Sequence, residues 1–173
     1  AVLPGGHTAN AAYWYEGGST GDWISSTYYM DELPKWVQKY NKSKAVERYK
    51  KVWETLEPLN TYTESGSDQN AYEGLSKGEE HSGFPHYLDK LWDQNGAFSS
   101  LSATPFGNSI LTDFALEALA AEELGTDEIP DFLAISYSST DYVGHKYGVN
   151  SVEVQDTYMR LDLELARLFS QLD

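Results

Sequence analysis

The run from Asp131 to Tyr137 constrains the fold of this chain more than any other segment. It is almost continuously apolar, and it has the length of one strand. Segments with helical periodicity lie on either side of it. A strand without alternating polar residues is typical of a parallel strand that is buried on both faces. The run therefore predicts an α/β fold with parallel strands and with helices on both faces of the sheet.

Two helices are predicted around that strand. The first is expected to begin at Asn108 or Ser109 and to end at Gly125, since these residues suit the two ends of a helix. The second spans residues 151–172, where apolar residues recur at helical spacing. Its apolar face comprises Val154, Tyr158, Leu161, Leu165, Leu168 and Leu172. A separate charged face comprises Asp156, Arg160, Glu164 and Arg167. Residues 104–173 are thus predicted to form a core of helix, strand, loop and helix.

The first 103 residues have a less regular pattern. Residues 1–33 indicate loops and short strands, because β-forming residues alternate with glycines. Residues 34–57 predict a helix that is bounded by two prolines. Residues 58–103 contain many breakers and indicate one short helix, near residues 87–93. A loop of this length is usually functional or an insertion. We therefore interpret residues 34–103 as a helical and irregular insertion or cap.

Charge and composition exclude several classes of protein. The net charge is −15 with only 12 basic residues, so nucleic acid is not an expected partner. Seven of those basic residues lie between Lys35 and Lys51, where their spacing suits a solvated helix face. No apolar run is long enough to span a membrane. There is no cysteine, which excludes thiol chemistry, disulfides and cysteine zinc sites.

The start of the chain does not resemble a signal peptide, and it lacks an initiating methionine. Ala1 is interpreted as a processed terminus or a cloning boundary. The chain has 13 tyrosines and 5 tryptophans, many of them next to Gly, Ser or Thr. Such a composition is common in extracytoplasmic proteins.

The segment from Ser138 to Gly148 follows the predicted strand and contains Asp141 and His145. Ligands of open α/β sheets bind beyond the carboxyl ends of the strands. A carboxylate and an imidazole are suitable zinc ligands, and four-residue spacing lets both face one point if the chain coils through about one turn. The alternative is an Asp-capped loop with a hydrogen-bonded histidine.

A family resemblance favours the metal interpretation. Asp141-Tyr-Val-Gly-His-Lys-Tyr-Gly148, placed after an apolar strand, resembles the type I phosphodiesterase and nucleotide pyrophosphatase family. Within that family the chain most resembles the bacterial monoesterase-type alkaline phosphatases. The supporting motifs are Leu3 to Trp14, Ser26-Thr-Tyr-Tyr29, Leu33-Pro-Lys-Trp-Val37 and Thr104-Pro-Phe-Gly-Asn-Ser109.

The resemblance implies a partial alkaline-phosphatase-like layered fold and two zinc ions in the parent enzyme. It implies that Asp141 and His145 hold one zinc together with a distant histidine. It also places the threonine nucleophile, which forms a covalent phosphoenzyme, before Ala1, along with a Lys-x-Arg pair that grips phosphate. An Asp-His-Gly strand with further ligands is expected after Asp173. Residues 1–173 are therefore expected to be an internal segment of one catalytic domain, with no catalytic nucleophile and no assigned substrate-binding residue.

His7, His81 and His86 are further candidate ligands. His81 and His86 are expected to be solvated loop histidines, whereas His7 lies near the expected phosphate-gripping segment. Residues 104–108 are expected to shape a helix entry, with phosphate binding as the alternative. The aromatic residues around Trp14, Trp23 and Tyr28 are expected to pack on a sheet, with sugar stacking as the alternative.

The function that these observations predict is a segment of a periplasmic or secreted, zinc-dependent phosphatase that hydrolyses phosphate monoesters and is inactive alone. Phosphodiester or nucleotide pyrophosphate hydrolysis is the alternative within the family. A non-catalytic, aromatic-rich binding module of a secreted protein is the alternative from another class. A sheet that is separated from its neighbours exposes apolar edges, so we expect either self-association of the chain or a piece clipped from a larger protein around a stable kernel.

Overall fold

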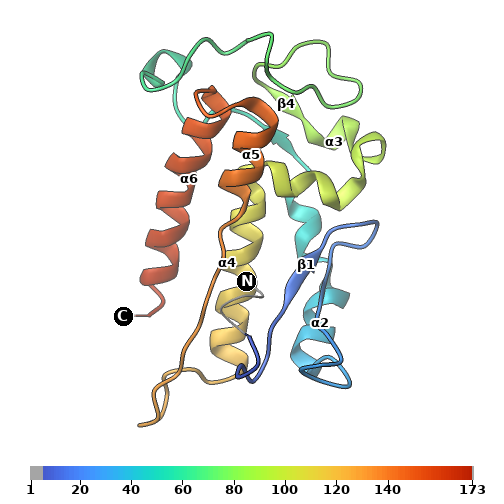
Figure 1. Ribbon diagram of the computed structural model, residues 1–173, viewed down its shortest axis with the longest axis vertical. Coiled ribbons are helices and arrows are strands. Elements are labelled where there is room, and N and C mark those ends of the chain that lie inside the picture. The colour runs from blue at the N-terminus through green and yellow to red at the C-terminus, as the bar shows by residue number, and fades with distance from the viewer. Residues whose placement is uncertain (1–5, 173) are drawn as a thin grey trace.

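The computed structural model describes residues 6–172. At its centre lies α4 (Pro105–Ala121), which packs against both α5 (Ser139–Tyr147) and α6 (Val152–Phe169). Figure 1 shows α4 and α6 side by side, with α5 at one end of the pair. Among the described residues, no helix combines the length and apolar character needed to cross a bilayer.

The N-terminal region is a short antiparallel hairpin of β1 (Trp14–Glu16) and β2 (Asp22–Ile24), as the sequence predicts for residues 1–33. Its turn uses Gly21 at a φ of 67°, where a Cβ would meet the ring of Phe98. The ring of Trp23 stacks on that of Phe114 in α4, with centroids 3.8 Å apart. The hairpin is therefore fixed to α4 by aromatic packing.

The helix predicted for residues 34–57 is shorter than expected. It is formed as α2 (Lys35–Ser43) and stops at Lys44, whose φ of 55° is left-handed. A 3₁₀ helix, η1 (Ala45–Tyr49), and the short strand β3 (Val52–Trp53) follow. The prediction was wrong beyond Ser43 because β3 pairs with a strand distant in sequence, β4 (His86–Tyr87).

Residues 58–103 are irregular, as predicted. They contain η2 (Leu59–Thr61), β4, α3 (Leu88–Leu91), η3 (Asp93–Asn95) and η4 (Ala97–Ala103). The short helix expected near residues 87–93 is thus confirmed as α3. Between η2 and β4 the chain has neither helix nor strand, and we call residues 62–85 the irregular segment. Figure 1 shows this segment arching over the ends of α5 and α6.

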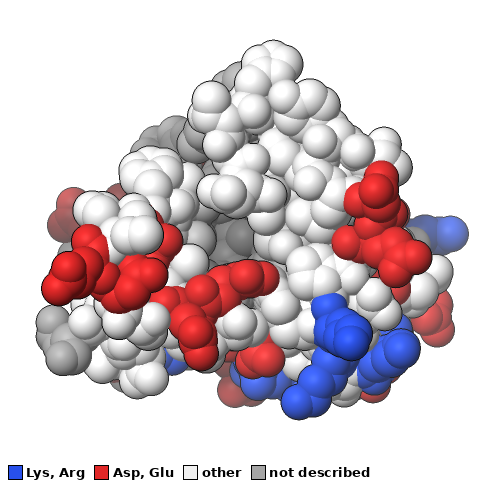
Figure 2. Space-filling view, turned by 90° about the horizontal axis from the view of Figure 1, so that it is seen from below, with Lys and Arg blue, Asp and Glu red and all other residues white. Residues whose placement is uncertain are grey.

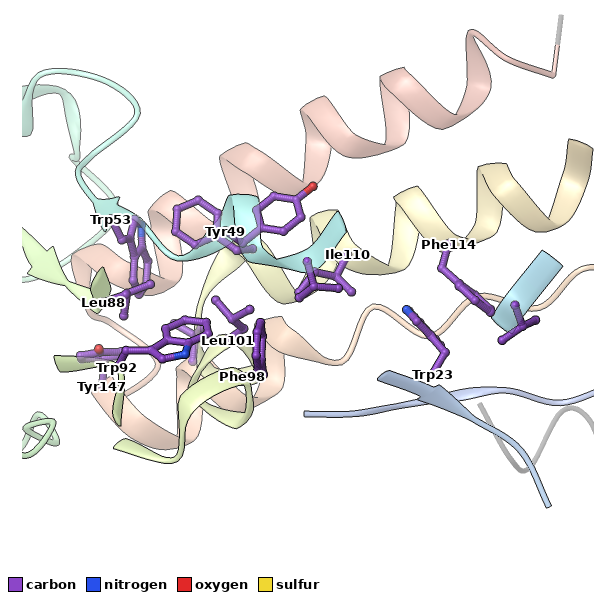
Figure 3. Close-up of a cluster of buried hydrophobic side chains, with 14 residues drawn as sticks. Trp23, Tyr49, Trp53, Leu88, Trp92, Phe98, Leu101, Ile110, Phe114 and Tyr147 are labelled. Carbon is purple, nitrogen blue, oxygen red and sulfur yellow. The ribbon is translucent and has the colours of Figure 1, made fainter. Parts of the chain in front are cut away.

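The buried core connects these regions around one face of α4 (Figure 3). Ile110 and Phe114 come from α4, and Leu101 from η4. Trp53 and Tyr147 are fully buried at the end of the core nearest the irregular segment. Large aromatic side chains supply most of this core, which explains why a chain with so little regular sheet can bury a continuous interior.

The two long helices are confirmed, with shifted boundaries. α4 begins at Pro105 rather than at Asn108, because proline fits the first turn of a helix. α6 begins after Ser151, whose Oγ accepts a hydrogen bond from the backbone N of Val154 at 3.2 Å.

The faces of α6 differ from the prediction. Asp156, expected on the charged face, is fully buried, whereas Tyr158 of the expected apolar face is exposed. The Asp156 carboxylate accepts hydrogen bonds from four donors: Trp53 Nε1, Leu56 N, Tyr62 OH and Arg160 Nε. A carboxylate that is satisfied in this way can be buried.

The strand predicted at residues 131–137 is not formed. The segment is extended, but it pairs with no other strand in residues 6–172. Its side chains are largely outside the core, and Phe132 is 87% exposed. A strand needs a neighbour to take its backbone hydrogen bonds, and the two described sheets are short antiparallel pairs elsewhere.

The unpaired segment borders a groove of about 930 Å³. Residues 8–13, one side of α4 and residues 130–136 line it. In the view from below in Figure 2 the molecule is hollowed at its middle, with Lys and Arg gathered on one side of the hollow.

Candidate functional site

The two predicted ligands lie together on α5. Asp141 and His145 are one turn apart on the same face, with His145 Nε2 and Asp141 Oδ2 separated by 3.5 Å. Their side chains are 73% and 78% exposed. The segment coils through a complete helix, so the turn expected from the spacing is present. The pair faces solvent and is open to further ligands.

The start of α5 is set by its crossing with α4. Gly107 of α4 faces Ser139, and a Cβ at this glycine would lie 2.1 Å from Ser139 Oγ. The backbone N of Ser139 donates to Asn108 Oδ1 at 3.3 Å. Both Gly107 and Asn108 are buried, so the helix entry predicted at residues 104–108 serves this packing. The first turn of α5, which carries Asp141, therefore depends on close contact with α4.

The end of α5 is held by the irregular segment. The backbone N of Gly74 donates to the carbonyl of Lys146 at 2.7 Å, and Lys146 Nζ donates to Ser76 Oγ at 2.5 Å. Gly148 then takes a φ of 93°, with the ring of Tyr72 against it. These contacts fix the turn that contains His145.

The donor set suits a zinc ion only in part. A carboxylate oxygen and an imidazole nitrogen that converge on one exposed point match zinc ligands in type. Within residues 6–172, no group of three or more His, Asp or Glu side chains is arranged to hold a metal. A closed zinc site needs four ligands, so these two side chains alone do not complete one.

Sequence reasoning missed the role of His86. This side chain was expected to be solvated, but it is fully buried. Its Nδ1 lies 3.0 Å from Glu79 Oε1, and its Nε2 lies 3.0 Å from Glu153 Oε1. The two partners are 7 and 67 positions away, so no local pattern marks the cluster.

The cluster perturbs the acid–base behaviour of its members. Burial opposes the charge on His86, but the hydrogen bonds with Glu153 and Glu79 outweigh it and raise the His86 pKa. Burial likewise opposes ionisation of Glu79, but its bonds with His86 and Ser76 N lower the Glu79 pKa to about 2. For Glu153 burial prevails, so its pKa is raised.

The remaining candidate residues serve other contacts. His7 Nδ1 lies 2.8 Å from the hydroxyl of Tyr28, and His81 Nδ1 lies 3.1 Å from the carbonyl of Gly83. Trp23 is buried in the core, which agrees with packing rather than with sugar stacking. Leu3 to Gly5 of the first motif lie outside the described residues.

Comparison with known proteins covers the whole chain. The model of the family described as type I phosphodiesterase / nucleotide pyrophosphatase matches residues 1–173. A protein of Myroides odoratus named calcium-transporting ATPase is 50% identical over 99% of this chain. Alkaline phosphatase PhoV of Synechococcus elongatus is 49% identical over all of it, and alkaline phosphatase PafA of Elizabethkingia meningoseptica is 43% identical over all of it.

Solved structures of PafA also match the whole chain. The crystal structure of wild-type PafA matches all of this chain at 42% identity with a TM-score of 0.93, and a mutant of PafA matches with a TM-score of 0.92. The match covers 33% of the PafA chain, and 31–32% of PhoV, PafA and the Myroides protein. The chain thus spans about a third of the length of these relatives. The partial alkaline-phosphatase-like fold that the sequence predicts is confirmed.

Proposed function

The chain belongs to the type I phosphodiesterase / nucleotide pyrophosphatase family, and we propose that it is an internal segment of a zinc-dependent phosphatase that acts on phosphate monoesters. The exposed pair of Asp141 and His145 carries this proposal. Two relatives with the same 173-residue region at 43–49% identity are named alkaline phosphatases, which supports monoester hydrolysis as the reaction.

Asp141 and His145 would hold one zinc ion in this proposal, through a carboxylate oxygen and a ring nitrogen. Bound zinc neutralises developing charge on phosphate oxygens and lowers the pKa of a coordinated hydroxyl. The role of this chain is to present the two donors 3.5 Å apart on a rigid helix, which pre-organises half of the coordination sphere. The remaining ligands and the nucleophile would come from chain outside these residues.

The groove supports the view that residues 1–173 are part of one catalytic domain. The unpaired segment at 131–137 would become a parallel strand when further strands lie in the groove beside it. Residues 104–173 then supply the core elements, and residues 34–103 the insertion or cap. In isolation the exposed segment is expected to promote self-association, which sedimentation of the chain would detect.

Different substrates distinguish monoester hydrolysis from its alternatives. Cleavage of diesters or nucleotide pyrophosphates is the alternative within the family. The name of the Myroides relative adds ATP as a substrate to compare. The binding-module alternative has no specific observation in its favour, because Trp23 lies in the core. A periplasmic or secreted location, typical of alkaline phosphatases, completes the proposal.

The proposal is tested with a full-length protein that contains this chain. We expect zinc-dependent release of phosphate from an aryl phosphate, faster than cleavage of a bis-aryl phosphate or of ATP. Asp141→Asn and His145→Ala should each lower this rate by more than about 100-fold, since even residues that only support metal ligands cost 10–100-fold. His81→Ala, which changes an exposed histidine, is the matched control.

Near-normal rates in both ligand variants at limiting zinc would refute the assignment. The 173-residue chain alone should have no measurable activity, because it contributes only two ligands and no identified nucleophile. Efficient turnover by the chain alone would require a nucleophile among its own residues.

A further inference from the structure

The buried cluster around His86 joins three parts of the chain that meet at the end of α5. Glu79 comes from the irregular segment, His86 from β4 and Glu153 from the first turn of α6. The ring of Tyr147, at the end of α5, lies against the His86 ring with centroids 5.0 Å apart. The cluster therefore lies where the irregular segment covers α5 and α6 (Figure 1).

The geometry of the cluster fits a protonated imidazole between two ionised carboxylates. Each ring nitrogen of His86 faces a carboxylate oxygen at 3.0 Å, and an ionised carboxylate only accepts hydrogen bonds. Both contacts are hydrogen bonds to ionised carboxylates only when both nitrogens carry a proton. A neutral ring would turn one lone pair toward a carboxylate. The second oxygen of Glu153, Oε2, has no hydrogen-bond partner within the described residues, so His86 is the main support of its charge.

Other charges also face the cluster. Lys146 of α5 is close enough to Glu79 and Glu153 to interact with both charges. Glu73 of the irregular segment adds negative charge near Glu153, and Tyr147 contributes an uncharged hydroxyl. The rings of Trp53 and Phe84 complete the contacts of His86 and carry no charge. One imidazolium therefore stands among more acidic groups than basic ones, which favours its protonated form.

The irregular segment contacts both the cluster, through Glu79, and the end of α5, through backbone and side-chain hydrogen bonds. Gly74 N donates to Lys146 O, Lys146 Nζ donates to Ser76 Oγ, and Gly66 N donates to Asn150 O at 2.7 Å. Glu79 is linked to these contacts through Ser76, because the second oxygen of Glu79, Oε2, accepts a hydrogen bond from Ser76 N at 2.5 Å. Lys146 directly follows His145 in the chain. A change at the cluster is thus transmitted to the turn of α5 that carries the proposed ligand.

We propose that Glu79, His86 and Glu153 form a proton-dependent latch, which holds residues 66–87 on the last turn of α5 and so positions His145 beside Asp141. The positioning part rests on the proposed function, whereas the latch itself does not. His86 is a positioning residue in this scheme, since it acts through the irregular segment and Lys146.

The direction of the pH effect follows from the raised pKa of His86. A group whose pKa is higher in the folded state than its ordinary value of 6.5 stabilises the fold fully below that value. The contribution is lost as the pH rises through the folded-state pKa. The lowered pKa of Glu79 sets the acid limit, because its contribution is fully present above the ordinary value of 4.5 and is lost as the pH falls from there to about 2. The latch is closed between these limits and opens on the alkaline side.

Amide hydrogen exchange of the 173-residue chain, followed by NMR, tests the latch. We expect the protection factor of the Gly74 amide to fall at least tenfold as the pH rises, in step with the titration of the His86 ring protons. In His86→Gln the protection factor of the Gly74 amide should be low already at neutral pH, and its stepwise fall with rising pH should be absent. His81→Gln, a neighbouring exposed histidine, should leave protection as in the wild type.

Glu153→Gln guards against a variant that fails to fold. The amide oxygen can still accept from His86 but carries no charge, so the step should remain and move to lower pH. Unchanged Gly74 protection in His86→Gln, or a step that does not follow His86, would overturn the proposal. So would a Glu153→Gln step at the wild-type pH.

The full-length protein tests positioning. We expect Glu153→Gln to move the alkaline limb of the pH–rate profile to lower pH, and His86→Gln to weaken zinc retention by tenfold or more. Wild-type zinc retention and pH profile in both variants would overturn positioning. Near-normal activity in Asp141→Asn would instead overturn the proposed function, while the exchange data would still decide the latch.

Discussion

Two acid–histidine clusters lie on neighbouring elements of this chain, and their surroundings give them opposite roles. Asp141 and His145 are separated by 3.5 Å and are mostly exposed, whereas His86 is fully buried between Glu79 and Glu153 at 3.0 Å. In water an ion pair contributes little, so the exposed pair can exchange its contact for a metal at small cost. In the interior the same residue types cannot separate without leaving an uncompensated charge. Burial, rather than residue type, distinguishes the exposed pair, which we propose as zinc ligands, from the structural cluster around His86.

The two clusters are nevertheless connected through α5. The exposed pair depends on Gly107 and Asn108 at one end of the helix and on the segment held by His86 at the other. Buried contacts at both ends of α5 therefore support the solvent-facing pair, as the proposed metal site would require.

The largest expected effect is the difference in stability between the two histidines. His86→Ala should lower the free energy of unfolding by about 3–5 kcal/mol, because it leaves two buried carboxylates without their partner. His145→Ala should change it by less than about 0.5 kcal/mol, as is usual for exposed positions. Urea denaturation at neutral pH measures both. Equal effects of the two substitutions would remove the contrast between the clusters.

A smaller effect is expected at the crossing of α4 and α5. Gly107→Ala should destabilise the chain by about 1–3 kcal/mol, because its Cβ would overlap Ser139 Oγ and the carbonyl of Leu101. In the full-length protein it should also weaken zinc retention, since it displaces the turn that carries Asp141. Thermal denaturation and metal analysis provide the two measurements. A stable variant that retains zinc normally would show that the exposed pair does not depend on this contact.

The pH dependence of stability sharpens the comparison further. Above the ordinary histidine pKa of 6.5, the unfolded chain has lost the His86 proton while the folded chain keeps it. Stability should therefore fall with rising pH by up to about 1.4 kcal/mol per pH unit, until the folded-state pKa is passed. The measurement stays below the ordinary tyrosine pKa of 10.0. His86→Gln should flatten this dependence; an unchanged dependence in His86→Gln would mean that another group carries the proton.

The smallest expected effect has the opposite sign. Gly144 lies between the two proposed ligands on α5, and a Cβ there meets nothing within 4 Å. Gly144→Ala should stabilise the chain by about 0.5–1 kcal/mol, because alanine is the better helix former. Thermal denaturation of the chain would measure it, with Gly107→Ala as the contrasting glycine. A loss of stability in Gly144→Ala would contradict this prediction and would mean that glycine itself is required at this position of α5.

Several features of the fold were predictable from residues close together in sequence. The helices at 105–121 and 152–169 agree with the apolar spacing, although the first begins at Pro105 rather than at the predicted Asn108 or Ser109. The pairing of Asp141 with His145 follows from their four-residue separation. The short helix at Leu88–Leu91 and the irregular course around it also agree with the local pattern.

Tertiary structure decided the features whose partners are distant. Asp156 belongs to the charged pattern of its helix, yet it is buried because Trp53 and Tyr62 donate to it from nearly a hundred residues away. His86 has an ordinary loop sequence around it, and its burial depends on Glu153, 67 positions later. The run at 131–137 has the composition of a strand and remains unpaired among the described residues.

The sequence by itself therefore determined the family, the helices and the two neighbouring donors on α5, because each depends on residues within a few turns or on a contiguous motif. Only the tertiary structure decided which acids and histidines are buried and whether an extended segment becomes a strand. The physical reason is that burial needs hydrogen-bond partners, and a strand needs a neighbouring backbone, and both are supplied by segments whose identity the local pattern does not contain.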